Sequence, residues 1–327
     1  MNVRALVNSF LWAAACIGLP TAGRQQFALP PQAPEPRLDL TAAEIELYKN
    51  APTLIDWTPL QIRHCPYLHK LQDAVSQDQL PMILERVGQT VTDQFHDFPR
   101  VTCDEEISET RPEGRVQYMQ DYSAVPVTSD TTVSQKLHYI ILPRPSSDTP
   151  GFEEYRTDVN GNPFDTSSLV GFVMISSKYA SIYLYFSPAD QHDSRFRYFG
   201  TEAIRDRACH VVGFAQVPEK ARRIEAFHSM GATFVLLSQG LAWIDCENFQ
   251  ILRIATWLLA PRKDIGVSYQ ASTVDFYPVQ PSGSERVLWL PADVTVVIAY
   301  RHVQFRNTHH YSNFKLFRVE STIKPGP

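Results

Sequence analysis

The sequence lacks the short motifs that mark the common catalytic and nucleotide-binding sites. It contains no GxSxG nucleophile elbow, no HExxH zinc motif, no P-loop and no GxGxxG loop. It also contains no CxxC pair, which argues against a thioredoxin-like centre and against the usual zinc sites. We therefore expect no recognisable catalytic residue, no metal and no cofactor.

Basic residues are not in excess either. The 30 Lys and Arg residues are outnumbered by 35 Asp and Glu residues, the net charge is −5, and no basic block occurs. Binding of nucleic acid needs clustered Lys and Arg that displace counterions, so we expect no nucleic-acid partner. The hydrophobic content of 44% is enough for a sizeable core, in one large or two small domains.

The only long apolar run lies at the N-terminus. One positive charge within the first four residues is followed by a mostly apolar stretch, 5–19, and by small residues at 21–23. This is the pattern of a secretory signal peptide, which we place at 1–23. The run is short for a spanning helix, which needs about 20 residues. We expect an exported protein, periplasmic or extracellular, that is peripheral to a membrane at most.

Two other interpretations of the N-terminus stay open. The apolar run could be an uncleaved anchor, or Cys16 could be the lipid-modified cysteine of a lipoprotein. Anchoring at Cys16 is less favoured because the usual Leu is missing before it and apolar residues continue after it.

Four cysteines would remain after removal of 1–23. An even number in an oxidising compartment suggests disulfides, but the sequence does not choose among the possible pairings, and some could be buried thiols. The four are Cys65, Cys103, Cys209 and Cys246.

Residues 24–40 are rich in Pro and Gln and predict a flexible, partly extended arm. A helical N-terminal region is predicted to follow over 41–98. Thr41 and Glu44 have the spacing of a capping box at the start of a short helix that ends near Asn50.

A stronger helix is predicted over 77–97. Ser76 and Gln79 also have capping-box spacing, and apolar residues recur at the period of a helix. They form one apolar face, which we expect to pack on the protein's own core. The residues of this face are Leu80, Leu84, Val87, Val91 and Phe95.

The rest of the chain, 99–327, is predicted to form an antiparallel β domain. Short strands follow one another without the helices that parallel strands need, which favours one large sheet arranged as a sandwich or barrel. The expected strands are Tyr118–Val127, Lys136–Leu142, Gly151–Asp158, Ile182–Phe186, Phe196–Ala203, Cys209–Gln216, Phe234–Ser238, Leu241–Asp245, Gln250–Leu259, Ser272–Pro278, Val287–Leu290, Asp293–Tyr300 and Asn313–Val319.

Three local clusters combine residue types that can bind a metal or act as a nucleophile. The cluster at 190–193 contains two Asp and one His, but it follows Pro188 and is typical of a solvated turn. His309-His310 and Cys209-His210 are adjacent pairs on strands, where neighbouring side chains point to opposite faces. None of the three predicts a metal site or a catalytic cysteine.

Several strand motifs follow one another in an informative order: 196–204 with 207–214, Gly240–Asp245 with Asn248–Arg253, and Trp289–Val294. This order resembles that of the periplasmic outer-membrane lipoprotein carrier and receptor proteins and of the related lipid-sensing sigma-factor regulators. The resemblance covers about 196–300, roughly a third of the chain. The chain also resembles uncharacterised secreted bacterial proteins with the same core and an N-terminal helical region.

The resemblance implies a half-open antiparallel barrel, in which helices cover an apolar concave face that holds acyl chains. We accordingly expect an α+β, β-rich fold with a large curved antiparallel sheet and N-terminal helices packed on it. The chain departs from the family in its extra N-terminal length and in Arg205-Asp206-Arg207, where the family turn contains Gly. The basic residue that carriers use to hand over cargo has no counterpart that we can place.

These observations predict an exported cell-envelope protein that binds an acyl-chain or lipid-like ligand, such as a lipoprotein acyl chain, on a concave apolar face. The candidate ligand-binding residues are Trp243, Ile254, Leu258 and Phe276. Burial of an acyl chain gives about 0.8 kcal/mol per CH₂ and needs no polar motif, in keeping with the missing catalytic signatures. The alternatives are a structural or protein-interaction module of the envelope with a filled core, and a secreted hydrolase with an unrecognised site.

Overall fold

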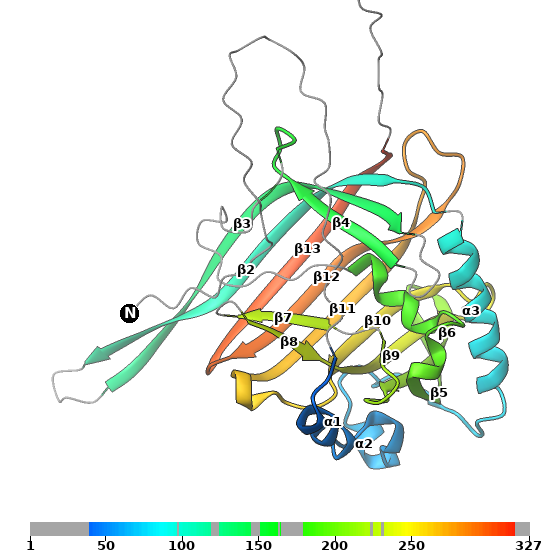
Figure 1. Cartoon of the computed structure of the whole chain (residues 1–327), viewed down its shortest axis with the longest axis horizontal. Coiled ribbons are helices and arrows are strands. Elements are labelled where there is room, and N and C mark those ends of the chain that lie inside the picture. Colours follow the sequence, from blue (N-terminus) through cyan, green and yellow to red (C-terminus); the bar gives the residue numbers. More distant parts are fainter. Residues whose placement is uncertain are drawn as a thin grey trace, which may run out of the picture.

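The computed structural model describes residues 39–96, 98–118, 124–144, 151–162, 164, 179–222, 225–229 and 232–317. The expected signal peptide and nearly all of the expected arm, 24–40, lie outside the described residues. Strands dominate the described chain, and short helices precede and interrupt them (Figure 1). No helix in these ranges is both long enough and apolar enough to cross a membrane.

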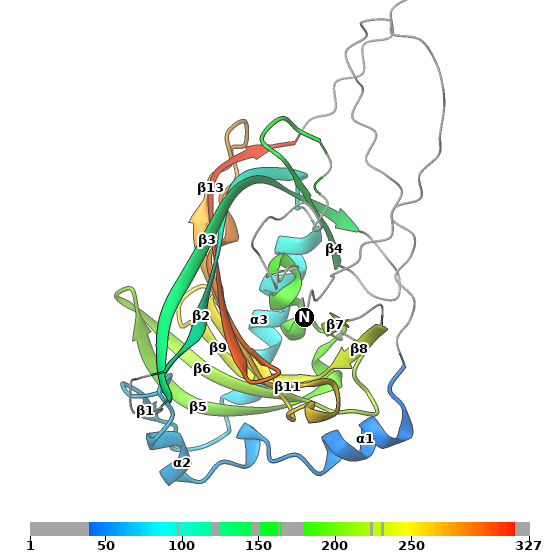
Figure 2. The same cartoon turned by 90° about the vertical axis from the view of Figure 1, so that its left-hand side faces the viewer.

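One antiparallel sheet of eleven strands organises the molecule, in the order β1-β5-β6-β9-β10-β11-β12-β13-β2-β3-β4. Figure 2 shows that this sheet is strongly curved, with β1 and β4 at its two edges. The expected α+β, β-rich fold with a large curved antiparallel sheet is confirmed. Its strands are β1 Gln72–Asp73, β2 Val101–Tyr118, β3 Ala124–Arg144, β4 Gly151–Thr157, β5 Ser194–Ile204, β6 Arg207–Gln216, β9 Ser238–Asp245, β10 Ile251–Leu258, β11 Val267–Val279, β12 Leu288–Tyr300 and β13 Val303–Leu316. A separate hairpin pairs β7 Glu225–Ser229 with β8 Ala232–Leu236.

The helices, with η for 3₁₀ helices, are α1 Ala42–Lys49, η1 Leu54–Asp56, α2 Pro59–Arg63, α3 Leu80–His96, η3 Tyr179–Phe186, η4 Gln191–Asp193 and η5 Lys263–Ile265. The capping box of Thr41 and Glu44 is confirmed, since each side chain accepts a hydrogen bond from the other residue's backbone N–H. The box of Ser76 and Gln79 is wrong. Because α3 begins only at Leu80, Gln79 precedes the helix, and the Ser76 hydroxyl accepts from the backbone N–H of Asp78 instead.

The expected strand Ile182–Phe186 is wrong in type, because these residues lie in η3. A continuous run of buried apolar residues does not by itself distinguish a buried helix from a strand. The expected strand Tyr118–Val127 is wrong in position. It spans the end of β2 and the start of β3, where Tyr118 and Ala124 are register partners.

Three further expected strands had the right type but the wrong bounds. Val287–Leu290 and Asp293–Tyr300 belong to a single strand, β12, and Pro291 sits at a register shift opposite Phe276. A proline is tolerated at such a bulge because no ladder hydrogen bond is required from it. The last strand, β13, begins at Val303 and not at Asn313.

Strand alternation divides the buried side chains into two layers. Figure 2 shows α3 inside the curve of the sheet, and α1 and α2 outside it. Val87 and Val91 of α3 belong to the concave core, which confirms that the apolar face of this helix packs on the protein's own sheet. On the convex side, a Cβ added at Gly213 of β6 would lie 2.3 Å from Leu54 Cδ1 of η1, so η1 sits directly on the strand.

All four described cysteines are free thiols. Cys65 and Cys209 belong to the convex core and Cys103 to the concave core, whereas Cys246 is half-buried. The expectation of disulfides is therefore wrong, and the buried-thiol interpretation holds. Burial raises the pKa of Cys209 to about 12, which keeps this thiol protonated and unreactive.

Candidate ligand-binding site

The structure brings together three of the four candidate lining residues. Ile254, Leu258 and Phe276 lie in the concave core, and each is at most 7% exposed. Trp243 lies in the convex core, where η1 and α2 cover it. The register explains the difference, because Ala242 and not Trp243 is the partner of Ile254. Trp243 therefore cannot line a site on the concave face.

The apolar part of the concave face is covered by η3. Seven of its eight side chains are buried. Its aromatic rings contact different strands of the sheet. Tyr183 contacts Phe276 of β11 with ring centroids 6.0 Å apart, and Phe186 contacts Phe214 of β6 with ring centroids 5.7 Å apart. The segment η3 thus lies across the strands and occupies the face on which we expected a ligand.

The helix α3 is tied to the C-terminal end of η3. Gln191 Nε2 donates to the carbonyl oxygen of Leu84 in α3 at 2.8 Å and to that of Phe186 in η3 at 2.9 Å. Gly88 of α3 permits this close packing, since a Cβ there would lie 2.9 Å from Gln191 Nε2.

Side chains fill nearly all of the space between α3, η3 and the sheet. The cavity left there has a volume of about 10 Å³, which is room for about one water molecule at most. Val91, Tyr183 and Phe276 are among its lining residues. Between α3, η3 and strands β10 to β12, the protein's own side chains therefore fill the concave face.

The rest of the concave face, on β2, β4 and β13, carries a buried polar cluster, which we define as Glu105, Arg156, His309 and Tyr311. Glu105 accepts two hydrogen bonds from the Arg156 guanidinium, at 2.6 and 2.8 Å. The same carboxyl group lies 2.8 Å from His309 Nδ1 and accepts from the Tyr311 hydroxyl at 3.0 Å. The side chains of Glu105 and His309 are both 0% exposed.

The contacts of the polar cluster determine its protonation. Burial alone would raise the pKa of Glu105, but Arg156 and His309 hold it well below its usual range, so Glu105 is a carboxylate. A carboxylate only accepts hydrogen bonds, which assigns the proton of His309 to Nδ1. Burial lowers the pKa of His309, so the ring is neutral and Nε2 is an acceptor. The Tyr179 hydroxyl of η3, 3.3 Å from this nitrogen, donates to it.

Two more carboxyl groups lie near the polar cluster. Glu109, whose side chain is 0% exposed, pairs with Arg111 at 2.8 Å. Glu154 accepts a hydrogen bond from the Tyr139 hydroxyl. Tyr139 packs against Tyr311 of the cluster, with ring centroids 5.1 Å apart. This part of the concave face therefore combines three carboxyl groups with two guanidinium groups among the described side chains.

Comparison with known proteins gives matches among solved structures alone. No protein-family model matches the chain, and no curated protein matches it in sequence. Among solved structures, a DUF1329 family protein from Desulfovibrio piger is 11% identical, with 75% of this chain and 95% of that chain covered and a TM-score of 0.37. A LolA superfamily protein from Nitrosomonas europaea is 11% identical, with 76% and 96% covered and a TM-score of 0.30.

A third match is a structure described as an outer membrane lipoprotein-sorting protein domain from Vibrio parahaemolyticus. It is 11% identical, covers 74% of this chain and 93% of its own, and has a TM-score of 0.34. The second and third structures are named as a LolA superfamily protein and a lipoprotein-sorting domain, the kind of protein that the strand motifs within 196–300 resemble. At this identity and score, the likeness assigns no ligand and no residue role to this chain.

Sequence reasoning did not identify the polar cluster. The expectation that His309 and His310 point to opposite faces is confirmed, since His309 is buried and the side chain of His310 is 61% exposed. A signal was present in β2, where Cys103, Glu105 and Glu109 all lie at inward-facing positions of one strand. Two glutamates at such positions are unusual enough to indicate a buried polar site.

The cluster at 190–193 is not the solvated turn that we expected. Asp190 and Asp193 are at most 2% exposed, and Arg222 pairs with them at 3.4 and 3.2 Å. The prediction is wrong because the neutralising cation lies 29 residues away from Asp193 in the chain, outside any local pattern. In the described ranges, no group of three or more His, Cys, Asp or Glu residues is placed to hold a metal ion.

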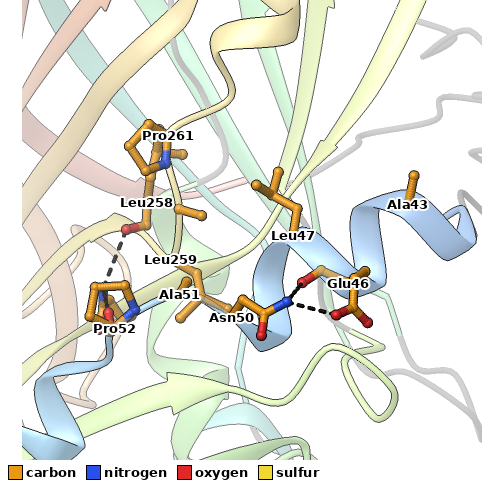
Figure 3. Close-up of a pocket in the computed structure, with 11 residues that line it drawn as sticks. Ala43, Glu46, Leu47, Asn50, Ala51, Pro52, Leu258, Leu259 and Pro261 are labelled. Atoms are coloured by element: carbon orange, nitrogen blue, oxygen red, sulfur yellow. Dashed lines mark hydrogen bonds between the residues drawn. The ribbon is translucent and has the colours of Figure 1, made fainter.

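A shallow groove lies apart from the concave core, between α1 and the end of β10 (Figure 3). Its volume is about 750 Å³, and its lining is mainly apolar, with Leu47, Leu258 and Pro261. The Asn50 amide donates to the Glu46 carboxylate at 2.7 Å within α1. Leu258, a candidate lining residue, therefore borders both the concave core and this groove.

Proposed function

We propose that the protein is an exported cell-envelope protein that binds an acyl-chain or lipid-like ligand on its concave face, and that the ligand replaces η3. One observation carries the proposal: the apolar concave face is covered by a segment that is not a strand of the sheet and that contacts it through side chains. An eight-residue 3₁₀ helix is long for its type, because its hydrogen bonds have poorer geometry than those of an α-helix. Its position depends on packing more than on its own backbone.

The free energies of such an exchange are of similar size. Exposure of the seven buried side chains of η3 costs roughly 10–20 kcal/mol, at about 1.5–3 kcal/mol each. Burial of an acyl chain of about 16 methylenes gives about 13 kcal/mol. A long acyl chain can therefore replace η3 wholly or in part, whereas a short one cannot. Ile254, Leu258 and Phe276 would line the exposed face.

Export is part of the proposal and is supported by the signal-peptide pattern at 1–23. We place the mature protein in the periplasm or outside the cell, peripheral to a membrane at most. Its parts would be a helical region over 41–98 and a β half-barrel over 99–327, and its partner a lipid or a lipoprotein acyl chain.

Native mass spectrometry after gentle purification, followed by titration with fluorescent acyl probes of increasing length, tests the proposal. We expect lipid adducts, and an affinity that rises by up to about four-fold per added methylene. Phe276→Leu on the concave face should change the preferred chain length. The matched control Phe199→Leu, at a buried convex position, should not. Absence of both lipid adducts and probe binding would contradict the proposal.

A second candidate function is a structural or protein-interaction module of the envelope with a filled core. The cavity of only about 10 Å³ on the concave face favours it. This function predicts that no lipid co-purifies and that η3 keeps its place in the presence of any acyl probe.

A further inference from the structure

The segment η3 is itself an amphipathic occupant of the concave face. At one end, the Tyr179 ring lies against His309 of β13, with ring centroids 5.1 Å apart, and its hydroxyl reaches Nε2 at 3.3 Å. At the other end, Phe186 lies on β6 and β5, against Phe214 and Phe196. A molecule that takes the place of η3 therefore meets a hydrogen-bond acceptor near β13 and an apolar surface towards β6.

The acceptor is held in place by the polar cluster. Glu105 orients the imidazole through Nδ1, so Nε2 points to the position of the Tyr179 hydroxyl. A ligand that displaces Tyr179 must supply a donor at the same place, because a buried acceptor without a donor is costly. A hydroxyl supplies one. A carboxylate and a methyl ester do not.

A buried donor lies beside this acceptor. Asn307 precedes His309 by two residues on β13 and faces the same side of the sheet. Asn307 is 2% exposed, and its Nδ2 has no hydrogen-bond partner among the described residues. Buried amides are nearly always paired, so this nitrogen indicates a place for a ligand oxygen. An acceptor and a donor side by side match a head group with more than one hydroxyl.

The local charges oppose an anionic head group. Glu105, Glu109 and Glu154 bring three carboxyl groups to this part of the face. Among the described contacts, Arg156 pairs with Glu105 and Arg111 pairs with Glu109. A bound carboxylate or phosphate would compete with these glutamates for the same guanidinium groups, in a site where a charge without its own partner is strongly unfavourable.

We infer that the ligand is an acyl ester of an uncharged polyol, with one hydroxyl donating to His309 Nε2 and another oxygen accepting from Asn307 Nδ2. Glycerol and sugar head groups share this chemistry. The inference rests on the proposed function, because it requires that the ligand replaces η3. Glu105 and Arg156 act as positioning residues for His309 and reject anionic heads.

Competition against one fluorescent acyl probe, with the full chain and three ligands of equal chain length, tests the inference. The ligands are 1-monopalmitoylglycerol, palmitate and methyl palmitate. We expect monopalmitoylglycerol to bind at least about ten-fold more tightly than the other two, because burial of an unpaired charge or loss of the donor is costly. Equal binding of all three, or tightest binding of palmitate, overturns the head-group inference and leaves the proposed function standing. Binding of none overturns the proposed function.

Two hydroxyl deletions within η3 give a matched pair. Tyr179→Phe removes the internal donor to His309 from the ligand-free state, so monopalmitoylglycerol and palmitate should both bind about three- to ten-fold more tightly. Tyr185→Phe, near the other end of η3, should change the affinity for neither ligand.

Asn307→Val should reduce the affinity ratio of monopalmitoylglycerol to methyl palmitate. A variant that only destabilises the fold should weaken binding of both ligands equally and leave this ratio unchanged. An unchanged ratio, or equal effects of the two tyrosine variants, overturns the inference.

Discussion

The hydroxyl of Tyr179 lies 3.3 Å from Nε2 of His309, and this contact joins η3 to the sheet at β13. Through Nδ1, the same imidazole contacts Glu105, which holds the Arg156 guanidinium in turn. One chain of hydrogen bonds therefore runs from the segment that fills the concave face to a buried ion pair. The stability of the polar cluster and the position of η3 are coupled through His309.

Removal of the charge of Glu105 should strongly destabilise the fold. Glu105→Gln leaves the buried Arg156 without its carboxylate, and breaking such a pair costs about 3–5 kcal/mol. Urea unfolding followed by circular dichroism measures the change. Asp293→Asn is the matched control. It breaks an exposed pair with His310, which lies next to His309 on β13, and should have little effect. Similar losses in the two variants would show that the polar cluster is not a buried ion pair.

The polar cluster should make the fold sensitive to acid. The pKa of His309 is lowered by burial, so its contribution to stability is full above about 6.5 and is lost as the pH falls through the folded-state value. The pKa of Glu105 is also lowered, so its contribution is lost only below about 4.5. The free energy of unfolding should therefore fall as the pH drops below about 6.5. His309→Gln should flatten this fall just below about pH 6.5, and an unchanged slope would contradict the assignment of a neutral His309.

A side chain at position 213 should disrupt the packing of η1 on the convex face and destabilise the fold. In Gly213→Ala, the new Cβ would lie 2.3 Å from Leu54 Cδ1 and 2.4 Å from Phe199 Cε2. We expect a loss of about 1–3 kcal/mol, as for other overpacked cores. Gly151→Ala is the control, because the only described atom that its Cβ would meet is the end of the Arg144 side chain, at 3.4 Å. Thermal unfolding of both variants measures the difference, and equal melting temperatures would contradict the close packing.

The cysteines should be free and mostly unreactive. Alkylation of the mature chain in denaturant without reductant should label all four, as counted by mass spectrometry. In the native state, labelling should be slow at Cys209, whose thiol pKa is raised by burial to about 12, and fastest at the half-buried Cys246. Fewer than four labels in denaturant would indicate a disulfide.

Much of the fold could be predicted because its signals are local. The capping box at Thr41 and most strands from β5 to β12 follow from side-chain alternation and turn residues. The face on which a strand residue lies depends on pairing between strands. A register shift between Ile251 and Arg253 decides that Ile254 faces inward while Trp243 faces outward, and no local pattern contains that shift.

The missed parts of the site depend on contacts between distant segments. Glu105 and His309 are 204 residues apart, and Glu105 and Arg156 are 51 apart, so their proximity arises only when β13, β2 and β4 meet in the sheet. The segment η3 was mistaken for a strand because its apolar residues are buried on nearly all sides, which removes the helical period from the sequence.

Hydrogen exchange of η3, followed by mass spectrometry with and without monopalmitoylglycerol, tests the central claim most directly. If the ligand replaces η3, peptides that cover Tyr179–Phe186 exchange faster when the ligand is bound, while peptides from β10 and β11 are unchanged or slower. Ligand binding with η3 equally or better protected would contradict the exchange of η3 for ligand on the concave face.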